Sequence, residues 1–170
     1  MGSKPPIWRR IRVPGSVKLR KLHQILQVVM GWSNYHLHEF IIGESHFGEP
    51  DPDYGFEMKS DRTATLSQVI LHARSKFVYI YDFGDGWEHE ILIEAILASR
   101  AGMRCPVCLA GKRACPPEDC GGIWGYADFL KAIGDPNHEE HDNMLDWIGG
   151  GFDPEAFDLE EINQELKRMR

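Results

Sequence analysis

Several signatures of common protein classes are absent from this sequence. Its longest apolar runs fall far short of the roughly 20 residues that a membrane-spanning helix requires. No apolar segment follows the basic residues near the N-terminus, as it does in a secretory signal. The sequence contains no G-x-S-x-G, H-E-x-x-H, G-x-G-x-x-G or Walker-type glycine loop. We therefore expect a cytoplasmic protein without membrane contact, whose chemistry does not depend on a common catalytic motif.

Acidic residues are absent from the first 38 positions, and cysteine is absent outside positions 105–120. The first 38 residues carry seven Lys and Arg side chains, whereas the remaining 132 carry 12 basic and 26 acidic ones. Positions 135–161 alone hold ten acidic residues and no Lys or Arg. This asymmetry indicates either a charged partner or a fold in which the two ends of the chain face each other.

Positions 77–96 carry the pattern of a β-hairpin. Aromatic and apolar residues occupy every second position on both sides of a short turn: Phe77, Tyr79, Tyr81, Phe83, then Trp87, His89, Ile91 and Ile93. A period of two, rich in aromatic and β-branched residues, is typical of half-buried strands. Asp85 and Gly86 lie between the two runs, and both tolerate the positive φ of a tight turn. We expect this hairpin to be the centre of the fold.

The remaining pattern predicts a single α+β domain with a mixed or antiparallel sheet. A chain of 170 residues buries roughly 70% of its unfolded surface, enough for one core. We expect an N-terminal helix, three C-terminal helices and a cysteine-containing loop between the sheet and those last helices. The expected ranges are strands at 7–13, 35–42 and 54–58, helices at 17–30 and 65–72, loops at 43–53 and 99–125, and C-terminal helices around 126–133, from 135 and from 158.

The four cysteines form two close pairs, Cys105 with Cys108 and Cys115 with Cys120. Separations of two and four residues within a pair fit the ligands of a tetrahedral Zn²⁺ site. In a cytosolic chain such clusters are more often metal-binding or catalytic than a disulfide framework. The gap between the pairs is shorter than in common zinc ribbons, so packed reduced thiols or a disulfide remain alternatives. Redox chemistry at Cys105 and Cys108 is a third alternative, although no helix follows Cys108.

A second group of candidate ligands lies around the predicted hairpin. Asp82 and Asp85 bracket its turn, and His89 lies in its second strand. If these three side chains met at a bound metal ion, they would supply the parts of a hydrolase. The alternative is that the aspartates bond the turn backbone and that His89 is a paired surface group. Four further histidines lie in pairs on one face of a predicted strand or helix: His36, His38, His138 and His141.

Basic residues near the N-terminus predict a nucleic-acid contact. Arg10 and Arg12 share a face of the predicted first strand, and Arg20 and Lys21 lie on the outer face of the following helix. Lys and Arg side chains that line one surface displace counterions from phosphates. The alternative is that these side chains are only solvated.

Three long motifs, YDFGDGWEHEI, CLAGKRACPPEDCGG and WIGGGFDPEAFD, resemble the plasmid pRi ORF-three-like family. The segments IWRRIRVPGSVKLRKLHQILQVVMGW and YHLHEF also fit its N-terminal pattern, so the resemblance covers nearly the whole chain. It implies one α+β domain over 1–170 and association with mobile elements, without an established activity. Its signatures fall on Tyr81, Asp82, Phe83, Gly84, Asp85, Trp87, His89 and Glu90, and on Cys108, Leu109, Gly111, Cys115, Pro116, Pro117, Glu118 and Asp119. Cys105 is less typical of this pattern.

Members of this family are also labelled as insertion-element passenger proteins, with the name TnpR. A serine recombinase needs a nucleophilic serine among several active-site arginines, and this sequence does not contain that arrangement. We interpret the label as genomic association.

Two hypotheses follow. The first is a mobile-element-associated binding or adaptor domain, not an enzyme, with a structural Zn²⁺ at the four cysteines and a nucleic acid or a protein as partner. The alternative is a metal-dependent hydrolase or nuclease that uses Asp82, Asp85 and His89, or the pair His138 and His141. The sequence leaves the substrate and the oligomeric state open.

Overall fold

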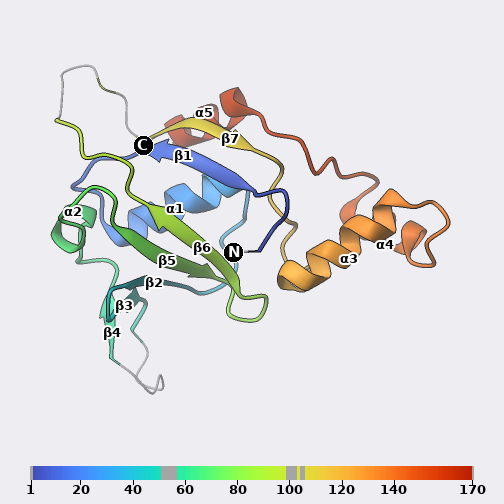
Figure 1. Ribbon diagram of the computed structural model, residues 1–170, viewed down its shortest axis with the longest axis horizontal. Helices are drawn as coiled ribbons and strands as arrows, with labels where there is room; N and C mark the ends of the chain where they lie inside the picture. Colours follow the sequence, from blue (N-terminus) through green and yellow to red (C-terminus); the bar gives the residue numbers. More distant parts are fainter. Residues whose placement is uncertain (1, 51–56, 99–102, 104–105, 170) are drawn as a thin grey trace.

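The computed structural model describes residues 2–50, 57–98, 103 and 106–169. Helices and strands alternate irregularly along the chain, which confirms the predicted α+β class. In order they are β1 (Trp8–Arg12), α1 (Leu19–Met30), β2 (His38–Ile42), β3 (Ser45–Gly48), β4 (Met58–Ser60), α2 (Leu66–Val69), β5 (Lys76–Tyr81), β6 (Trp87–Leu92), β7 (Val107–Lys112), α3 (Gly122–Gly134), α4 (His141–Ile148) and α5 (Leu159–Arg168) (Figure 1). No helix in these ranges has the length and apolar character needed to cross a membrane.

The strands form two sheets. One has five strands in the order β4-β3-β2-β5-β6, and the other pairs β1 with β7. The β3–β4 pair is parallel and the remaining pairs are antiparallel. The predicted hairpin is confirmed: β5 and β6 pair so that Tyr81 lies opposite Trp87 and Tyr79 lies opposite His89. Gly86 in its turn has a φ of 64°, which glycine adopts without strain.

α1 lies between the two sheets (Figure 1). On one side the guanidinium of Arg9 in β1 donates to the Val29 carbonyl at 2.7 Å. On the other side His23 and the Tyr79 hydroxyl of β5 form a hydrogen bond of 2.8 Å. The buried face of α1 carries apolar residues at helical spacing and packs in one core with the aromatic face of the sheet. The residues of α1 are Leu19, Leu22, Ile25 and Val29, and those of the sheet are Phe40, Phe77, Tyr79 and Tyr81. The core is therefore continuous across the layers.

The three predicted C-terminal helices are present, and one begins later than predicted. α3 and α4 project to one side, and α5 returns to pack against α1 and β7 (Figure 1). The predicted helix start at Asp135 was wrong, because residues 136–140 form turns and a bend and α4 begins at His141. The Asp135 carboxylate accepts from the backbone N–H of Asn137 at 2.9 Å. Such side-chain bonds compete with helical backbone bonds.

Both predicted loops contain a strand that the sequence pattern did not indicate. β3 lies within the expected loop 43–53, where Gly43 at a φ of 61° turns the chain back along β2. β7 lies within the expected loop 99–125 and pairs with β1, more than 90 residues away in sequence. Neither strand alternates apolar and polar residues clearly, so their conformation comes from pairing with a partner strand.

Candidate metal site at the end of the central hairpin

Three connections meet at the end of the five-stranded sheet. They are the segment between α1 and β2, the turn between β5 and β6, and the segment between β7 and α3. The backbone N–H of Asp82 in the turn donates to the Leu37 carbonyl of the first segment at 2.9 Å. The Asp85 carboxylate of the same turn accepts from the Gly121 N–H of the third segment at 3.1 Å. Segments far apart in the sequence are thus held side by side.

The hydroxyl of Tyr81, the last residue of β5, is the central link between these segments. It accepts from the backbone N–H groups of Tyr35 and His36 at 3.1 and 3.4 Å. It donates to the Glu118 carboxylate at 2.5 Å. The other oxygen of Glu118 accepts from the Ser33 N–H at 3.1 Å. Burial and this carboxylate raise the pKa of Tyr81, so the hydroxyl stays protonated and holds all three segments in place.

His36, Asp82 and Asp119 bring one potential metal-ligand atom each to within 4.8 Å of one another. The Nε2 atom of His36 lies 3.6 Å from an Asp82 carboxylate oxygen and 3.2 Å from an Asp119 oxygen. Ligands bound about 2.1 Å from one ion lie roughly 3 to 3.5 Å apart. The three side chains therefore have the spacing of a metal site.

The His36 Nε2 atom is shielded from solvent and makes no hydrogen bond within the described part of the chain. A neighbouring carboxylate usually accepts a hydrogen bond from such a nitrogen, and a shielded polar atom without one costs free energy. A cation placed between this nitrogen and the two carboxylates would satisfy all three groups.

Both aspartates hold unusual backbone conformations. Asp82 has a φ of 57° and Asp119 a φ of 58°, in the left-handed region that Asp tolerates better than most residues. One Asp82 oxygen accepts from the backbone N–H groups of Gly84 and Asp85 at 2.9 and 3.3 Å. Its other oxygen is the one that faces His36. The predicted bond of Asp82 to its own turn is present, and it fixes the second oxygen toward the histidine.

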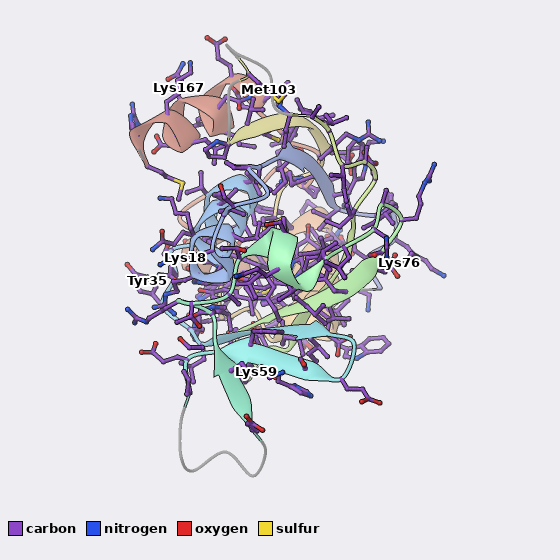
Figure 2. The ribbon with its side chains drawn as sticks, turned by 90° about the vertical axis from the view of Figure 1, so that its left-hand side faces the viewer. Lys18, Tyr35, Lys59, Lys76, Met103 and Lys167 are labelled. Carbon is purple, nitrogen blue, oxygen red and sulfur yellow. The ribbon has the colours of Figure 1, made fainter. Side chains whose placement is uncertain are left out.

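The site opens to solvent on one side. The side chain of Asp82 is 9% exposed and that of His36 is 27% exposed, whereas that of Asp119 is 71% exposed. Tyr35, the neighbour of His36, points outward at the edge of the molecule (Figure 2) and is 81% exposed. A metal held here would keep coordination positions that solvent or a substrate can reach.

Neither Asp85 nor His89 belongs to this group, although the sequence placed both with Asp82. Asp85 accepts from the Gly121 N–H, and so it joins the turn to the segment before α3. The ring of His89 packs edge-on against Trp32, with centroids 5.3 Å apart, and its Nδ1 lies 3.0 Å from the Trp87 carbonyl. Burial lowers the pKa of His89 to about 4. Asp82 is the member of the predicted set that the structure brings to a candidate site.

The other predicted histidines occupy three different settings. His36 was expected within a strand over 35–42, but β2 begins at His38 and His36 lies in the connection before it. His38 lies in β2, where its Nε2 is 2.9 Å from the buried Asp61 carboxylate. His138 accepts from the backbone N–H of Glu140, and His141 contacts the Ala132 carbonyl. The last two are thus engaged in local contacts around the start of α4.

The described cysteines do not join any group with metal-ligand spacing. Cys108 lies in β7 opposite Ile11, and its backbone carbonyl and N–H both bond the Asn163 side chain. Cys108, Cys115 and Cys120 are free thiols, and burial raises the pKa of each. Cys105 lies outside the described residues, so the four-cysteine zinc site stays a prediction.

The basic residues of the predicted nucleic-acid surface contact other parts of the same chain. Arg10 pairs with Glu94 at 2.9 Å, and the Lys21 ammonium donates to the Met169 carbonyl at 2.9 Å. Arg20 lies 3.6 Å from Glu49 and 3.7 Å from Asp61. Arg12 also has partners within the chain. Lys21 therefore contacts the C-terminal end of the chain, whereas Arg10 and Arg20 lie beside acidic residues between positions 49 and 94. Nucleic-acid binding stays a prediction.

Asp119 was not singled out as a ligand from the sequence, and His36 was named only beside His38. Each lies in a motif that carried the family resemblance, YHLHEF for His36 and CLAGKRACPPEDCGG for Asp119. The positions of polar residues within these separate motifs were the available signal. Nothing in their spacing showed that the motifs meet.

Comparisons with known proteins agree with these motifs. The sequence profile of the family described as "Plasmid pRiA4b ORF-3-like protein" matches residues 1–161. "Uncharacterized protein y4hQ" of Sinorhizobium fredii is 41% identical over 165 residues, which are 96% of this chain and 84% of that protein. The crystal structure of MM3350, a protein of unknown function from Methanosarcina mazei Go1, is similar with a TM-score of 0.85 and 39% identity. It covers 94% of this chain and 91% of its own. The chain therefore belongs to the plasmid pRiA4b ORF-3-like family, as its motifs predicted.

Proposed function

We propose that this protein binds a divalent metal ion through His36, Asp82 and Asp119 and uses it in a hydrolytic reaction. The observation that supports this function is the convergence of one imidazole nitrogen and two carboxylates within 4.8 Å, from three separate connections. The sequence analysis gave a metal-dependent hydrolase as its alternative hypothesis, and this proposal adopts that function. It replaces Asp85 and His89 by Asp119 and His36.

The ligand set narrows the choice of metal. Imidazole suits Zn²⁺ and Fe²⁺, and carboxylates suit Mn²⁺ and Mg²⁺, so a mixed set of one nitrogen and two oxygens favours Zn²⁺ or Mn²⁺. Three protein ligands with solvent access on one side match a catalytic metal site, which keeps an open coordination position. A structural zinc site has four protein ligands and no open position. A metal in such a site lowers the pKa of bound water and polarises a bound substrate oxygen.

Metal binding is tested by titrating Mn²⁺ into the protein and measuring free Mn²⁺ by electron paramagnetic resonance. We expect one site per chain, and we expect the substitution Asp82→Asn to weaken it at least tenfold. Asparagine keeps the oxygen that accepts from Gly84 and Asp85 and tolerates the positive φ, so the turn survives while the charge facing His36 is lost.

Asp128→Asn is the matched control. Asp128 lies exposed on α3, pairs with Lys131 at 2.7 Å and does not belong to the three-residue group, so its loss should change Mn²⁺ affinity less than twofold. Equal Mn²⁺ affinity in wild type and Asp82→Asn would overturn the assignment, as would a wild-type protein that binds no Mn²⁺ or Zn²⁺.

Catalysis is tested separately from binding. The Mn²⁺- or Zn²⁺-loaded protein is assayed with bis(p-nitrophenyl) phosphate, p-nitrophenyl phosphate and p-nitrophenyl acetate, with Asp119→Asn as the comparison variant. We expect hydrolysis of at least one ester that disappears in the variant. If the protein binds the metal but hydrolyses none of these esters, the hydrolase is rejected. The protein would then be a metal-binding domain, closer to the adaptor predicted from the sequence.

A further inference from the structure

A small cavity of about 90 Å³ adjoins the candidate metal site. It shares His36 with that site, and the exposed ring of Phe83, the neighbour of Asp82, also lines it. A cavity of this size holds several water molecules, and thus one tetrahedral oxyanion. Its polar lining comes from α1, from the connection after α1, from β2 and from the residue that follows β3: Arg20, Asn34, His36, His38 and Glu49.

We propose that this cavity binds the phosphoryl group of a substrate, with Arg20 and the Asn34 amide as hydrogen-bond donors beside the metal held by His36. The inference rests on the proposed function, because it names the substrate class of the same site. A tetrahedral phosphate can place one oxygen on a metal and others on a guanidinium, the pairing that charge-assisted bonds to arginine favour.

The orientation of the Asn34 amide follows from a buried chain of hydrogen bonds. The backbone N–H of Asn34 donates to the Gln27 amide oxygen at 3.0 Å, so the Gln27 amide nitrogen is the group that donates to the Tyr79 hydroxyl at 3.0 Å. Because that hydroxyl already accepts from Gln27, it donates its hydrogen bond to His23 Nδ1, at 2.8 Å. The other ring nitrogen of His23 therefore carries the proton and donates to the Asn34 side-chain oxygen at 2.5 Å. The amide NH₂ of Asn34 stays available for the cavity.

His23 is suited to this fixed role. Its ring is fully buried and lies flat against His38, with centroids 3.5 Å apart and planes 6° apart. Burial, together with the neighbouring His38, lowers the pKa of His23 to about 3, so the ring is neutral at physiological pH. A neutral ring has one donor and one acceptor, which is what the chain from Tyr79 to Asn34 requires.

Arg20 is anchored and still has donors for a ligand. Its backbone N–H donates to the Asp61 carbonyl at 3.0 Å, and its guanidinium lies 3.7 Å from the Asp61 carboxylate and 3.6 Å from Glu49. These two separations are longer than a hydrogen bond. Asp61 is fully buried and is held by His38 at 2.9 Å. The guanidinium is thus kept at the cavity by charge while its N–H groups can turn to an anion.

The charges around the cavity make anion binding depend on the metal. Glu49, Asp61, Asp82 and Asp119 outnumber Arg20 there, so a phosphate would be repelled without a bound cation. A divalent ion at His36 offsets the two aspartates of the site. We therefore expect phosphate to bind together with Mn²⁺ and to bind far more weakly without it.

The experiment measures the relaxation of the ³¹P signal of inorganic phosphate by Mn²⁺ bound to the protein. We expect strong paramagnetic broadening in wild type. Asn34→Asp should lower the affinity for phosphate at least tenfold, because a carboxylate replaces the NH₂ donor while one carboxylate oxygen still accepts from His23. Arg20→Met should have a similar effect, and both variants should bind Mn²⁺ at least as tightly as wild type, because each makes the cavity more negative by one charge.

Arg62→Met is the matched control, because Arg62 pairs with Glu49 at 3.3 Å but does not line the cavity. If Mn²⁺ does not bind, the proposed function itself fails. If Mn²⁺ binds and phosphate is not broadened, the phosphoryl site is rejected while the metal site stands. Equal broadening in wild type, Asn34→Asp and Arg20→Met would mean that phosphate binds to the metal alone. That result would also reject the phosphoryl site. Acetate that displaces phosphate at equal concentration would reassign the cavity to carboxylates.

Discussion

The end of the five-stranded sheet and the β1–β7 pair hold their buried reactive side chains in different ways. At the sheet end, His23, Tyr79, Tyr81 and Asp61 are buried, and each bonds a polar group from another segment. On the β1–β7 side, Cys108 is buried with a weak contact to the carbonyl of Ala110, two residues away. Burying polar groups costs free energy unless they are paired, so an interlinked polar cluster indicates a place where side-chain position matters.

The largest expected effect tests how the sheet end is held together. Trp32 is 7% exposed, stacks on Tyr81 with centroids 4.8 Å apart and donates from its indole N–H to the Pro116 carbonyl at 3.0 Å. We expect Trp32→Ala to lower the free energy of unfolding by about 3–5 kcal/mol, because it leaves a large cavity and an unpaired carbonyl. Urea unfolding followed by circular dichroism measures the change.

Trp124→Ala is the matched control for this prediction. Trp124 is 82% exposed at the start of α3, so its loss should change stability by no more than about 0.5 kcal/mol. Equal losses for the two tryptophans would show that the three connections are not held by this packing.

The second prediction concerns the buried histidine of the sheet end. The pKa of His23 is lowered to about 3 in the folded protein and is about 6.5 in the unfolded chain. Between these values the unfolded state binds more protons than the folded state. The stability from a neutral His23 is therefore complete above about pH 6.5 and is lost as the pH falls toward 3, by about 1.4 kcal/mol per pH unit. His89, whose pKa is lowered to about 4, acts in the same direction.

Urea unfolding at pH 7.5, 6.0 and 5.0 measures this slope in the wild type and in His23→Gln. Between pH 6.0 and 5.0 we expect the pH slope of stability to be about 1.4 kcal/mol per pH unit smaller in the variant than in the wild type, whatever its stability at pH 7.5. His72→Gln, at an exposed position, serves as the control and should keep the wild-type slope. An unchanged slope in His23→Gln would mean that this ring takes up a proton in the folded protein, and the hydrogen-bond chain to Asn34 would then be wrong.

The sequence located the elements that have a clear local period. The period of two at Tyr79 and Tyr81 located the hairpin, and the helical spacing of Leu22 and Ile25 located α1. β7 has neither signal, because Ala110 and Gly111 interrupt its apolar run, and it is a strand because β1 lies beside it. Local periodicity describes which face a side chain takes, and long-range pairing is not contained in it.

The same limit explains which part of the site was missed. Asp82, Asp85 and His89 were grouped because they are neighbours in one hairpin. The strand period directs His89 toward Trp32, while Asp82 turns toward a histidine 46 positions earlier. Cysteine spacing suggested a metal site in the same way, from proximity in sequence. The residues that do converge come from connections whose meeting depends on the whole fold.

The smallest expected effect comes from a comparison of two adjacent residues, Asp119 and Cys120. It distinguishes a metal site at the cysteines from one at His36, Asp82 and Asp119. The sequence predicts Cys120 as a zinc ligand, whereas the structure places Asp119 in a different group of candidate ligands. We expect Cys120→Ser to leave Zn²⁺ and Mn²⁺ affinity within twofold of wild type, whereas Asp119→Asn, which keeps the tolerance of positive φ, should weaken both at least tenfold. Competition with a chromophoric chelator measures the affinity for Zn²⁺, and elemental analysis gives the stoichiometry.

If Cys120→Ser removed the zinc and Asp119→Asn did not, the cysteine segment would be the metal centre, and the convergence of His36, Asp82 and Asp119 would be an ion pair. Both substitutions change one side chain in the same connection, so a difference between them reports ligand identity and not a general loosening of that segment.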